Sequence, residues 1–297
     1  MPELPEVETV RKRLSDALLG AKIKQAHLRR RDVLRDPVGS RKGGSEPEQW
    51  LLSGRVLNAI ERRGKQLYLE DSTGQGLLIR LGMSGWVALT GKKEERKAHC
   101  HASWVLQTRS KEHLEMHFID PRRFGGLFAV RNRQDLESRF WSRLGPDALS
   151  VEPDDLDQSL VKTRRSLKAA LLDQRVLAGV GNIYADEALY AARMSPYRSA
   201  NTLNGQETSR LAEAIRNCLN AACERGGTTL KDYRAPGGER GGFASELKVY
   251  GRYGESCLRC GELLSEGRIT ARRTVWCSHC QSNPKVTPKV NTTRSYS

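Results

Sequence analysis

The first residues of the chain combine groups that can do covalent chemistry. The sequence begins Met1-Pro2-Glu3-Leu4-Pro5-Glu6, and a small residue such as Pro at the second position favours removal of the initiator methionine. Removal would leave Pro2 as a free secondary amine beside the Glu3 carboxylate. Such an amine can attack a sugar or carbonyl carbon and form an iminium ion, the electron sink of covalent amine catalysis. The α-amino group titrates near about 8 and a lysine near about 10.4, so more of the α-amine is neutral at neutral pH. The alternative is that Pro-Glu is an ordinary exposed start of a chain.

Four cysteines near the C-terminus have the spacing of a metal site. Cys257 and Cys260 form one Cys-x-x-Cys pair, and Cys277 and Cys280 form another farther along the chain. This pattern is typical of one structural Zn²⁺ held by four thiolates, with room for a β-hairpin between the pairs. The total of seven cysteines is odd, which argues against a disulfide framework.

The charge balance predicts a polyanionic partner. Fifty Lys and Arg against 35 Asp and Glu give a net charge of +15. A folded protein this basic is expected to bind nucleic acid, with an anionic membrane as the weaker possibility. No apolar run is long enough to span a bilayer, and no apolar segment follows the N-terminus. We therefore expect a cytoplasmic protein that does not bind membranes.

Two short motifs could bind a phosphate backbone. Gly179-Val180-Gly181-Asn182 precedes a helical pattern, and glycines together with the free N–H groups of a helix start allow close approach of phosphate. Asn182 could cap that helix or donate to the phosphate. Arg268, Arg272 and Arg273 lie between the cysteine pairs and could grip phosphates from the zinc hairpin. Each motif also fits a plain role, as a helix connection or as a solvated basic face.

Two further motifs could contact a duplex from which a base has been extruded. The segment Asp120-Pro121-Arg122-Arg123-Phe124-Gly125-Gly126 follows a strand pattern and is predicted to be an exposed turn. An arginine and an aromatic ring on such a turn could wedge into the void left by the base. Met83, in Leu81-Gly82-Met83-Ser84-Gly85, is a candidate second wedge. Taken alone, each of these is more often a hairpin or packing residue, and Lys65 after Gly64 is usually a solvated strand lysine.

Hydrophobic periodicity divides the chain into a β-rich part and a helical part. Short alternating runs between residues 23 and 130, separated by turn residues, predict a sandwich or barrel of antiparallel strands. After Gly145-Pro146 the period changes to about 3.6, which predicts helices. Strands are expected at 55–60, 66–70, 77–81, 86–89, 102–107 and 113–119, helices at 5–19, 167–176, 183–194 and 208–225, and loops at 35–49 and 226–242.

Together and in this order, the motifs resemble the formamidopyrimidine-DNA glycosylase family, the bacterial 8-oxoguanine DNA glycosylases and AP lyases. The matching segments are residues 1–9, 64–65, 81–85, 120–125, 179–184, 226–230, 249–252 and the four zinc cysteines. The resemblance implies an α+β multidomain protein. Its parts are an N-terminal catalytic antiparallel β-sandwich domain with an N-terminal helix (1–134), a helix-two-turn-helix DNA-binding domain with a lesion-capping loop (135–242), a zinc finger (243–282) and a disordered tail (283–297).

The resemblance also implies base-excision repair of oxidised purines, namely 8-oxoguanine and formamidopyrimidines. Pro2 would attack C1′ of the flipped nucleotide and displace the base, with Glu3 as the acid and base that helps to open the sugar. The 3′ and 5′ phosphates would then leave by β- and δ-elimination. Lys65 is implied to bind phosphate and donate a proton in β-elimination, and Arg272 to bind phosphate and act in δ-elimination. Arg273 departs from the family pattern of a small residue, so either arginine could fill that role.

The implied partner is damaged double-stranded DNA, bound by a monomer at the bacterial nucleoid. His101, two residues after the matching histidine, leaves the register of that contact open. The implied DNA-binding residues are Met83, His99, Arg122, Phe124 and Asn182.

Two other functions stay open at this stage. A non-catalytic zinc-dependent DNA-binding protein would use the finger and the helical turn, but would leave the Pro2 start and Lys65 unexplained. An endonuclease-VIII-like glycosylase for oxidised pyrimidines would share the chemistry, although Met83 and the Arg122–Phe124 wedge favour the purine branch.

Overall fold

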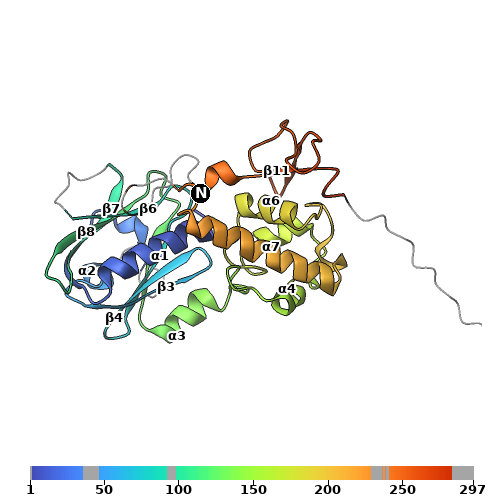
Figure 1. Ribbon diagram of the computed structural model, residues 1–297. Coiled ribbons are helices and arrows are strands. Elements are labelled where there is room, and N and C mark those ends of the chain that lie inside the picture. Colours follow the sequence, from blue (N-terminus) through green and yellow to red (C-terminus); the bar gives the residue numbers. More distant parts are fainter. Residues whose placement is uncertain are drawn as a thin grey trace, which may run out of the picture.

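The computed structural model describes residues 2–35, 47–91, 98–228, 236, 238 and 241–282. A β-rich lobe and a helical lobe lie side by side, and the N-terminus lies at the junction between them (Figure 1). The expected tail at 283–297 lies outside the described residues, as do most of the expected loop at 226–242 and residues 36–46 of the expected loop at 35–49.

The β-rich lobe is a sandwich of two sheets. Among the described residues, every strand pair is antiparallel except β2–β9, which is parallel over two residues, so the predicted antiparallel sandwich is confirmed apart from this short pair. The loop expected at 35–49 is wrong at both ends, because Arg35 belongs to β2 and residues 47–49 belong to the short helix α2 (Pro47–Trp50). The first sheet has the order β1 (Lys22–Leu28), β7 (Cys100–Gln107), β8 (His113–Ile119), β6 (Trp86–Thr90). The second has the order β2 (Leu34–Arg35), β9 (Gly126–Val130), β5 (Gly76–Arg80), β4 (Gln66–Asp71), β3 (Leu57–Arg63).

Helix α1 (Leu4–Leu18) completes the core of this lobe. Its apolar side chains recur at helical spacing, so one face of the helix is buried against the inner faces of both sheets. The helix begins with Pro5 in its first turn and a capping box in which Glu3 and Glu6 bond each other's backbone N–H groups. The residues of α1 in this core are Val7, Val10, Leu14 and Leu18.

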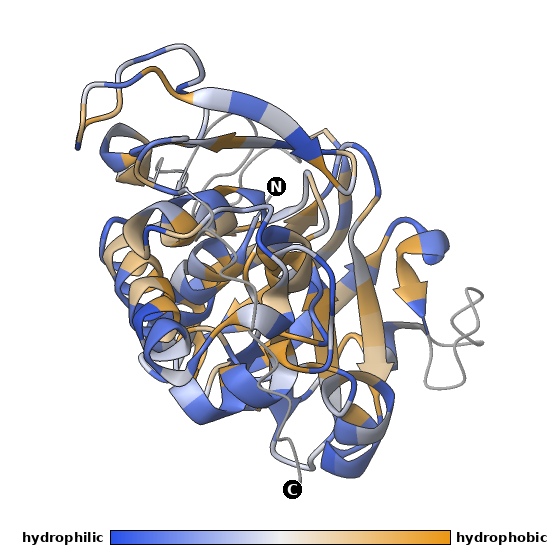
Figure 2. Cartoon of the chain, turned by 90° about the vertical axis from the view of Figure 1, so that its right-hand side faces the viewer, coloured by the Kyte–Doolittle hydropathy of each residue, from blue (hydrophilic) through white to orange (hydrophobic). Residues whose placement is uncertain are grey.

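The helical lobe has its own apolar core, and Leu4 at the start of α1 packs into that second core. Orange, apolar and blue, polar residues alternate along the helices (Figure 2). The helix predicted at 167–176 ends at Leu172, because the chain turns at Asp173, whose carboxylate accepts the Arg175 N–H of the next turn.

The helices are α2 (Pro47–Trp50), α3 (Arg133–Leu136), α4 (Pro153–Leu160), α5 (Leu167–Leu172), α6 (Asn182–Ala191) and α7 (Gly205–Glu224). The short turns are η1 (Arg31–Val33), η2 (Glu137–Trp141), η3 (Ala200–Thr202) and η4 (Phe243–Glu246).

The C-terminal unit is a two-stranded hairpin of β10 (Ser265–Ile269) and β11 (Arg272–Trp276). It lies above the helical lobe in Figure 1, over α6. The hairpin expected between the two cysteine pairs is therefore present.

A buried ion-pair network ties the two lobes together. The Arg62 side chain is 7% exposed. Its Nε donates to Glu8 Oε2 at 2.9 Å, and its two terminal nitrogens donate to the Asp147 carboxylate at 2.7 and 3.0 Å. Asp147 also accepts the Gly64 N–H at 2.7 Å. Helix α1, strand β3 and the connection into the helical lobe are thus held at one guanidinium.

Replacing Arg62 by Ala is expected to lower the free energy of unfolding by about 3 kcal/mol, because two largely buried carboxylates lose their common cation. Urea unfolding monitored by circular dichroism measures the loss. Arg63→Ala is the matched control, since the Arg63 side chain is 34% exposed and lies 3.8 Å from Glu137; we expect it to cost less than about 0.5 kcal/mol. Equal losses in the two variants would contradict the assignment.

Candidate functional site

The N-terminal arm caps a helix of the other lobe. Glu3 is 1% exposed, and its carboxylate accepts the N–H of Ile183 at 2.9 Å and that of Tyr184 at 3.4 Å. These are the second and third residues of α6, whose N-cap position is Gly181 and has no side-chain acceptor. A carboxylate there satisfies unpaired helix N–H groups and interacts favourably with the helix dipole. Pro2 is buried beside it.

Two glycines make room for this arm. A Cβ added to Gly181 would lie 2.3 Å from the Glu3 carboxyl carbon, and one added to Gly179 would lie 2.3 Å from Leu4. The Leu4 N–H also donates to the Gly179 carbonyl at 3.1 Å. The sequence predicted that a phosphate would lie close to these two glycines. In the structure, the protein's own N-terminal residues occupy that space.

Glu6 connects the arm to the segment that leads into the 226–242 loop. Its carboxylate accepts the Glu3 N–H, the Tyr184 hydroxyl and the Thr228 N–H, each at 2.7 Å. Burial raises the pKa of Glu6, and the neighbouring Glu3 charge acts in the same direction. Sequence reasoning gave Glu6 no role beyond the start of the helix. The sequence signal that could have revealed its role is its position three residues after the N-cap Glu3, which is typical of a capping box.

Lys65 and Arg272 face a common cavity of about 360 Å³ that also reaches Gly181 and Asn182. Gly64, with φ of 56°, makes the tight β3–β4 turn that presents Lys65. Burial lowers the pKa of Lys65, and Arg272 lowers it further, while Glu3 and Glu6 oppose the shift. Two of the other predicted catalytic residues, Glu3 and Arg272, thus act electrostatically on Lys65, and Pro2 is the neighbour of Glu3.

The finger turn separates its two arginines. Thr270 and Ala271 at the turn have φ of 49° and 59°, as a two-residue hairpin turn with left-handed central residues requires. Arg272 follows at once and lines the cavity. The Arg273 Nε donates to Glu266 Oε2 at 2.7 Å on the neighbouring strand. This geometry favours Arg272 as the residue that acts in the cavity.

A buried lysine and an amide hold the backbone of this hairpin. Lys168 is fully buried, forms an ion pair with Asp186 at 2.7 Å, and donates to the Arg273 carbonyl at 2.8 Å. The Asn182 side chain donates to the same carbonyl at 3.0 Å. Burial lowers the pKa of Lys168 and raises that of Asp186, so each charge depends on the other. Sequence reasoning missed both residues, although a lysine inside the apolar run 167–172 was a signal.

The two wedge loops are braced by Asp120. Its carboxylate, fully buried, accepts the Ser84 hydroxyl at 2.6 Å and the Gly125 N–H at 2.7 Å. Phe124 is 60% exposed, and the Arg122 guanidinium lies 5.2 Å from the centre of its ring. Met83, one residue before Ser84, is half-buried. The structure therefore presents Arg122 and Phe124 on a rigid turn and holds the Met83 loop against it.

The two candidate histidines differ in exposure. His101 is buried, and its Nε2 lies 2.8 Å from the Asp120 carbonyl oxygen, under the wedge turn. His99 is exposed, with φ of 63°. Only His99 of the pair is accessible to a ligand.

The four predicted metal ligands form one cluster. The Sγ atoms of Cys257, Cys260, Cys277 and Cys280 all lie within 4.8 Å of one another, and in the described part of the chain this is the one group of His, Cys, Asp and Glu placed to hold a metal ion. Four thiolates this close together fit a closed structural site. The cluster is fixed to α6, because Glu187 accepts the three N–H groups of Lys248, Val249 and Tyr250 at 2.8–2.9 Å.

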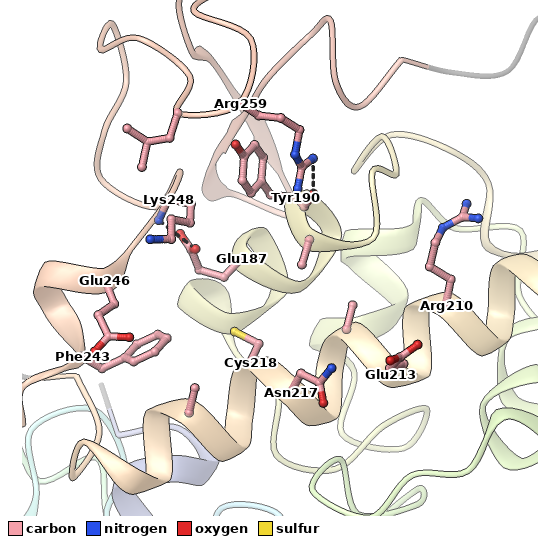
Figure 3. Close-up of a pocket in the computed structure, with 14 residues that line it drawn as sticks. Glu187, Tyr190, Arg210, Glu213, Asn217, Cys218, Phe243, Glu246, Lys248 and Arg259 are labelled. Atoms are coloured by element: carbon pink, nitrogen blue, oxygen red, sulfur yellow. Dashed lines mark hydrogen bonds between the residues drawn. The ribbon is translucent and has the colours of Figure 1, made fainter.

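A larger cavity of about 750 Å³ lies between α6, α7 and the base of the finger. Glu187 and Cys218 line it, and Arg259 lies over the Tyr190 ring and donates to the Tyr190 carbonyl (Figure 3). The residues that line it include none of the predicted catalytic or DNA-binding residues.

Membrane-spanning helices are absent from the part of the chain that the structure describes, since none of its helices is both long and apolar enough.

Comparisons with known proteins agree with the geometry. Residues 1–127 match the family model of the formamidopyrimidine-DNA glycosylase N-terminal domain, and residues 144–234 match the model of the H2TH domain of the same enzymes. Proteins named formamidopyrimidine-DNA glycosylase from Thermomicrobium roseum and Thermus thermophilus are 40% and 42% identical to the chain. Each match covers 95% of this chain and, respectively, 99% and 98% of the relative.

Solved structures give the same result. The crystal structure of the MutM (Fpg) protein from Thermus thermophilus superposes with a TM-score of 0.81 at 40% identity, covering 95% of this chain and all of that chain. The complex of Lactococcus lactis Fpg with DNA containing an abasic site superposes with a TM-score of 0.83 at 30% identity and the same coverage.

Gly181→Ala is expected to displace the Glu3 carboxylate and expose the first N–H groups of α6. Hydrogen–deuterium exchange of residues 182–190 should become at least 10-fold faster, since a cap of this kind contributes about 1–2 kcal/mol. Gly205→Ala is the control, because a Cβ there meets nothing within 4 Å at the start of α7. Unchanged exchange in Gly181→Ala would show that Glu3 does not cap α6.

Proposed function

The chain belongs to the formamidopyrimidine-DNA glycosylase family, and we propose from this premise that it removes oxidised purines from DNA with the Pro2 amine as nucleophile. As a member of the family it acts in base-excision DNA repair as a glycosylase and lyase on damaged DNA. The observation that carries the proposal is the position of the N-terminus: Pro2 and Glu3 are buried where the two lobes meet, next to the cavity of Lys65 and Arg272.

The glycosylase step forms one bond and breaks another. The Pro2 nitrogen bonds to C1′ of the extruded nucleotide, and the damaged base leaves with the electron pair of the glycosidic bond. The Glu3 carboxylate, held by the α6 N-terminus, is placed to exchange protons with the sugar ring as it opens. Ring opening leaves an iminium ion between Pro2 and C1′. This chemistry requires removal of Met1, since an acylated Pro2 nitrogen has no free lone pair.

The lyase step uses the two cations of the cavity. The iminium acidifies the C2′ hydrogens, so loss of a C2′ proton expels the 3′ phosphate, and a second elimination expels the 5′ phosphate. Lys65 binds a phosphate and supplies a proton, and burial, which lowers the pKa of its ammonium, makes it a stronger proton donor. Arg272 binds the phosphate that leaves in δ-elimination, because a guanidinium matches phosphate geometry.

The remaining predicted residues bind the duplex around the lesion. Arg122, Phe124 and Met83 fill the space vacated by the damaged nucleotide, and His99 contacts the strand nearby. Asn182 reaches DNA phosphate from the start of α6 and also positions the finger backbone. The exposure of Arg122, Phe124 and His99 supports these roles.

The metal is Zn²⁺ in this proposal, because four thiolate ligands select it among abundant divalent ions and a closed site is structural. A single chain supplies every residue named above, which supports action as a monomer, and its DNA substrate leads us to propose that it acts at the bacterial nucleoid. We propose the boundaries 1–134, 135–242 and 243–282 for the three functional parts.

Borohydride reduction during turnover is expected to trap the protein covalently on a duplex containing 8-oxoguanine opposite cytosine. Tryptic digestion and mass spectrometry of the adduct should place the crosslink on the Pro2 nitrogen, since borohydride reduces the iminium to a stable amine. A thymine-glycol duplex in competition tests the base preference, and we expect at least 10-fold less trapping on it.

An adduct mapped to Lys65 or to any other lysine would overturn Pro2 as the nucleophile. Protein in which mass spectrometry shows Met1 to be retained is the control, and it should give no adduct at Pro2.

Metal removal is expected to abolish binding of lesion DNA, because a four-thiolate finger does not stay folded without its ion. Elemental analysis of the purified protein should show one zinc per chain. Full DNA affinity after chelation, with loss of zinc confirmed by the same analysis, would contradict the structural role.

A further inference from the structure

Tyr190 is a buried residue in the last turn of α6 that contacts the cysteine cluster but has no place in the proposed reaction. Its hydroxyl lies 3.3 Å from the Cys257 Sγ atom, and the two residues are 5% and 3% exposed. We propose that the Tyr190 hydroxyl donates to the Cys257 thiolate of the metal site and so strengthens the binding of zinc. The inference rests on the zinc site of the proposed function and adds to it a residue from the helical lobe.

The direction of this hydrogen bond follows from the chemistry of the ligand. A cysteine binds zinc as the thiolate, which has no proton to give and can only accept a hydrogen bond. A phenol hydroxyl can donate one. Tyr190 is therefore the donor and Cys257 the acceptor whenever the metal is bound.

The cluster needs donors because its negative charge is in excess. Four thiolates around one divalent cation carry two more negative charges than the metal neutralises. The Arg259 N–H donates to Cys257 Sγ at 3.4 Å, and the Cys280 N–H donates to Cys277 Sγ at the same distance. Within the described residues, Tyr190 provides the one side-chain hydrogen bond to these sulfurs from outside the four cysteines.

The surroundings of this hydrogen bond exclude water. Tyr190 and Cys257 belong to a buried cluster that also contains Val249, Leu264 and Val275. In apolar surroundings a hydrogen bond is stronger than in water, and a charge that loses its donor is costly. Removal of this hydroxyl should therefore weaken zinc binding more than removal of an exposed one.

Arg259 holds the Tyr190 ring in position. The guanidinium carbon lies 4.4 Å from the centre of the ring, and Arg259 Nη1 donates to the Tyr190 carbonyl at 3.1 Å (Figure 3). A cation over the face of an aromatic ring attracts its electrons, which makes the phenol hydroxyl a stronger donor. Arg259 lies between Cys257 and Cys260 in the sequence. The loop that carries two of the ligands therefore also orients the donor to one of them.

The other contacts between α6 and the finger differ in kind. Asp186 and Glu187 accept backbone N–H groups of the finger and of the segment before it. These contacts position the backbone and do not reach a ligand atom. Tyr190 bonds the sulfur itself, so loss of its hydroxyl should change the affinity and the spectrum of the metal while the finger keeps its place on the helix.

Tyr197 provides a matched control. Its ring packs edge to face against Trp276 of β11, with 5.0 Å between the ring centres, and the residue is 41% exposed. Tyr190→Phe and Tyr197→Phe therefore each remove one hydroxyl from a tyrosine that contacts the finger. A general effect of losing a phenol oxygen near the finger would appear in both variants.

The first test is the zinc affinity of the full-length protein, measured by competition with chelators of known affinity. Tyr190→Phe should bind zinc about 10-fold more weakly than the wild type, the lower end of the loss seen when the partner of a metal ligand is removed. Tyr197→Phe should stay within about 2-fold of the wild type, as an exposed substitution does. Equal zinc affinities of Tyr190→Phe and the wild type would overturn the proposal.

Substitution of Co²⁺ for zinc gives a spectroscopic readout of the same hydrogen bond. The charge-transfer band of a Co²⁺–thiolate site reports the energy of the sulfur electrons, which a donated hydrogen bond lowers. Tyr190→Phe should therefore shift the band to longer wavelength, whereas Tyr197→Phe should leave it in place. Replacement of Tyr190 by 3-fluorotyrosine keeps the hydroxyl and makes it a stronger donor, so the band should shift to shorter wavelength. An unmoved band in these two variants of Tyr190 would overturn the proposal.

Two results keep this proposal apart from the proposed function. Wild-type protein in which elemental analysis finds no zinc would overturn both the zinc site and the role of Tyr190. If the wild type holds one zinc and is trapped at Pro2, while Tyr190→Phe keeps the wild-type zinc affinity, only the role of Tyr190 fails.

Discussion

The active-site geometry depends on one carboxylate that caps a helix from the far end of the sequence. Glu3 fills the N-cap acceptor role at α6 because Gly181 has no side chain and Gly179 leaves room for Leu4. A hydrogen-bonded cap fixes both distance and direction. The same contact therefore fixes how the β-rich lobe meets the helical lobe and where Pro2 lies. Helix, arm and lobe junction are one structural unit.

The finger is fixed to the same helix by hydrogen bonds of the opposite direction. At the start of α6, helix N–H groups donate to the Glu3 carboxylate, whereas farther along α6 the side chains of the helix accept N–H groups of the finger and of the segment before it. Asp186 accepts the Val275 N–H and Glu187 accepts three N–H groups before the first cysteine pair. Lys168 compensates the buried Asp186 charge and holds the Arg273 carbonyl. Arg272 therefore reaches the cavity on a backbone that is positioned by α5 and α6.

The sequence was sufficient for most of the elements and for the cluster of four cysteines, because those signals are local. Helical spacing from Val7 to Leu18, alternation in the strands and the paired cysteines each depend on near neighbours. The family resemblance added the roles of Lys65 and Arg272. Contacts between distant segments could not be predicted. The fit of Glu3 at Gly181, the shared carboxylate of Asp147 and the pairing of Lys168 with Asp186 join positions whose distance in space is set only by the completed fold. The two-residue parallel pair of β2 with β9 was missed for the same reason.

Polar contacts at the junction determine its geometry more than its stability. Buried carboxylates and a buried lysine lose hydration, and their partners return only about as much free energy as that loss. Apolar contact alone is non-directional and would tolerate sliding of the lobes. Glu3, Glu6 and Asp186 each meet a backbone N–H at a set distance, so a shift of one lobe would leave several buried charges unsatisfied together. That penalty keeps Pro2, Lys65 and Arg272 in register across segments that are far apart in the chain, as the proposed reaction at a single sugar carbon requires.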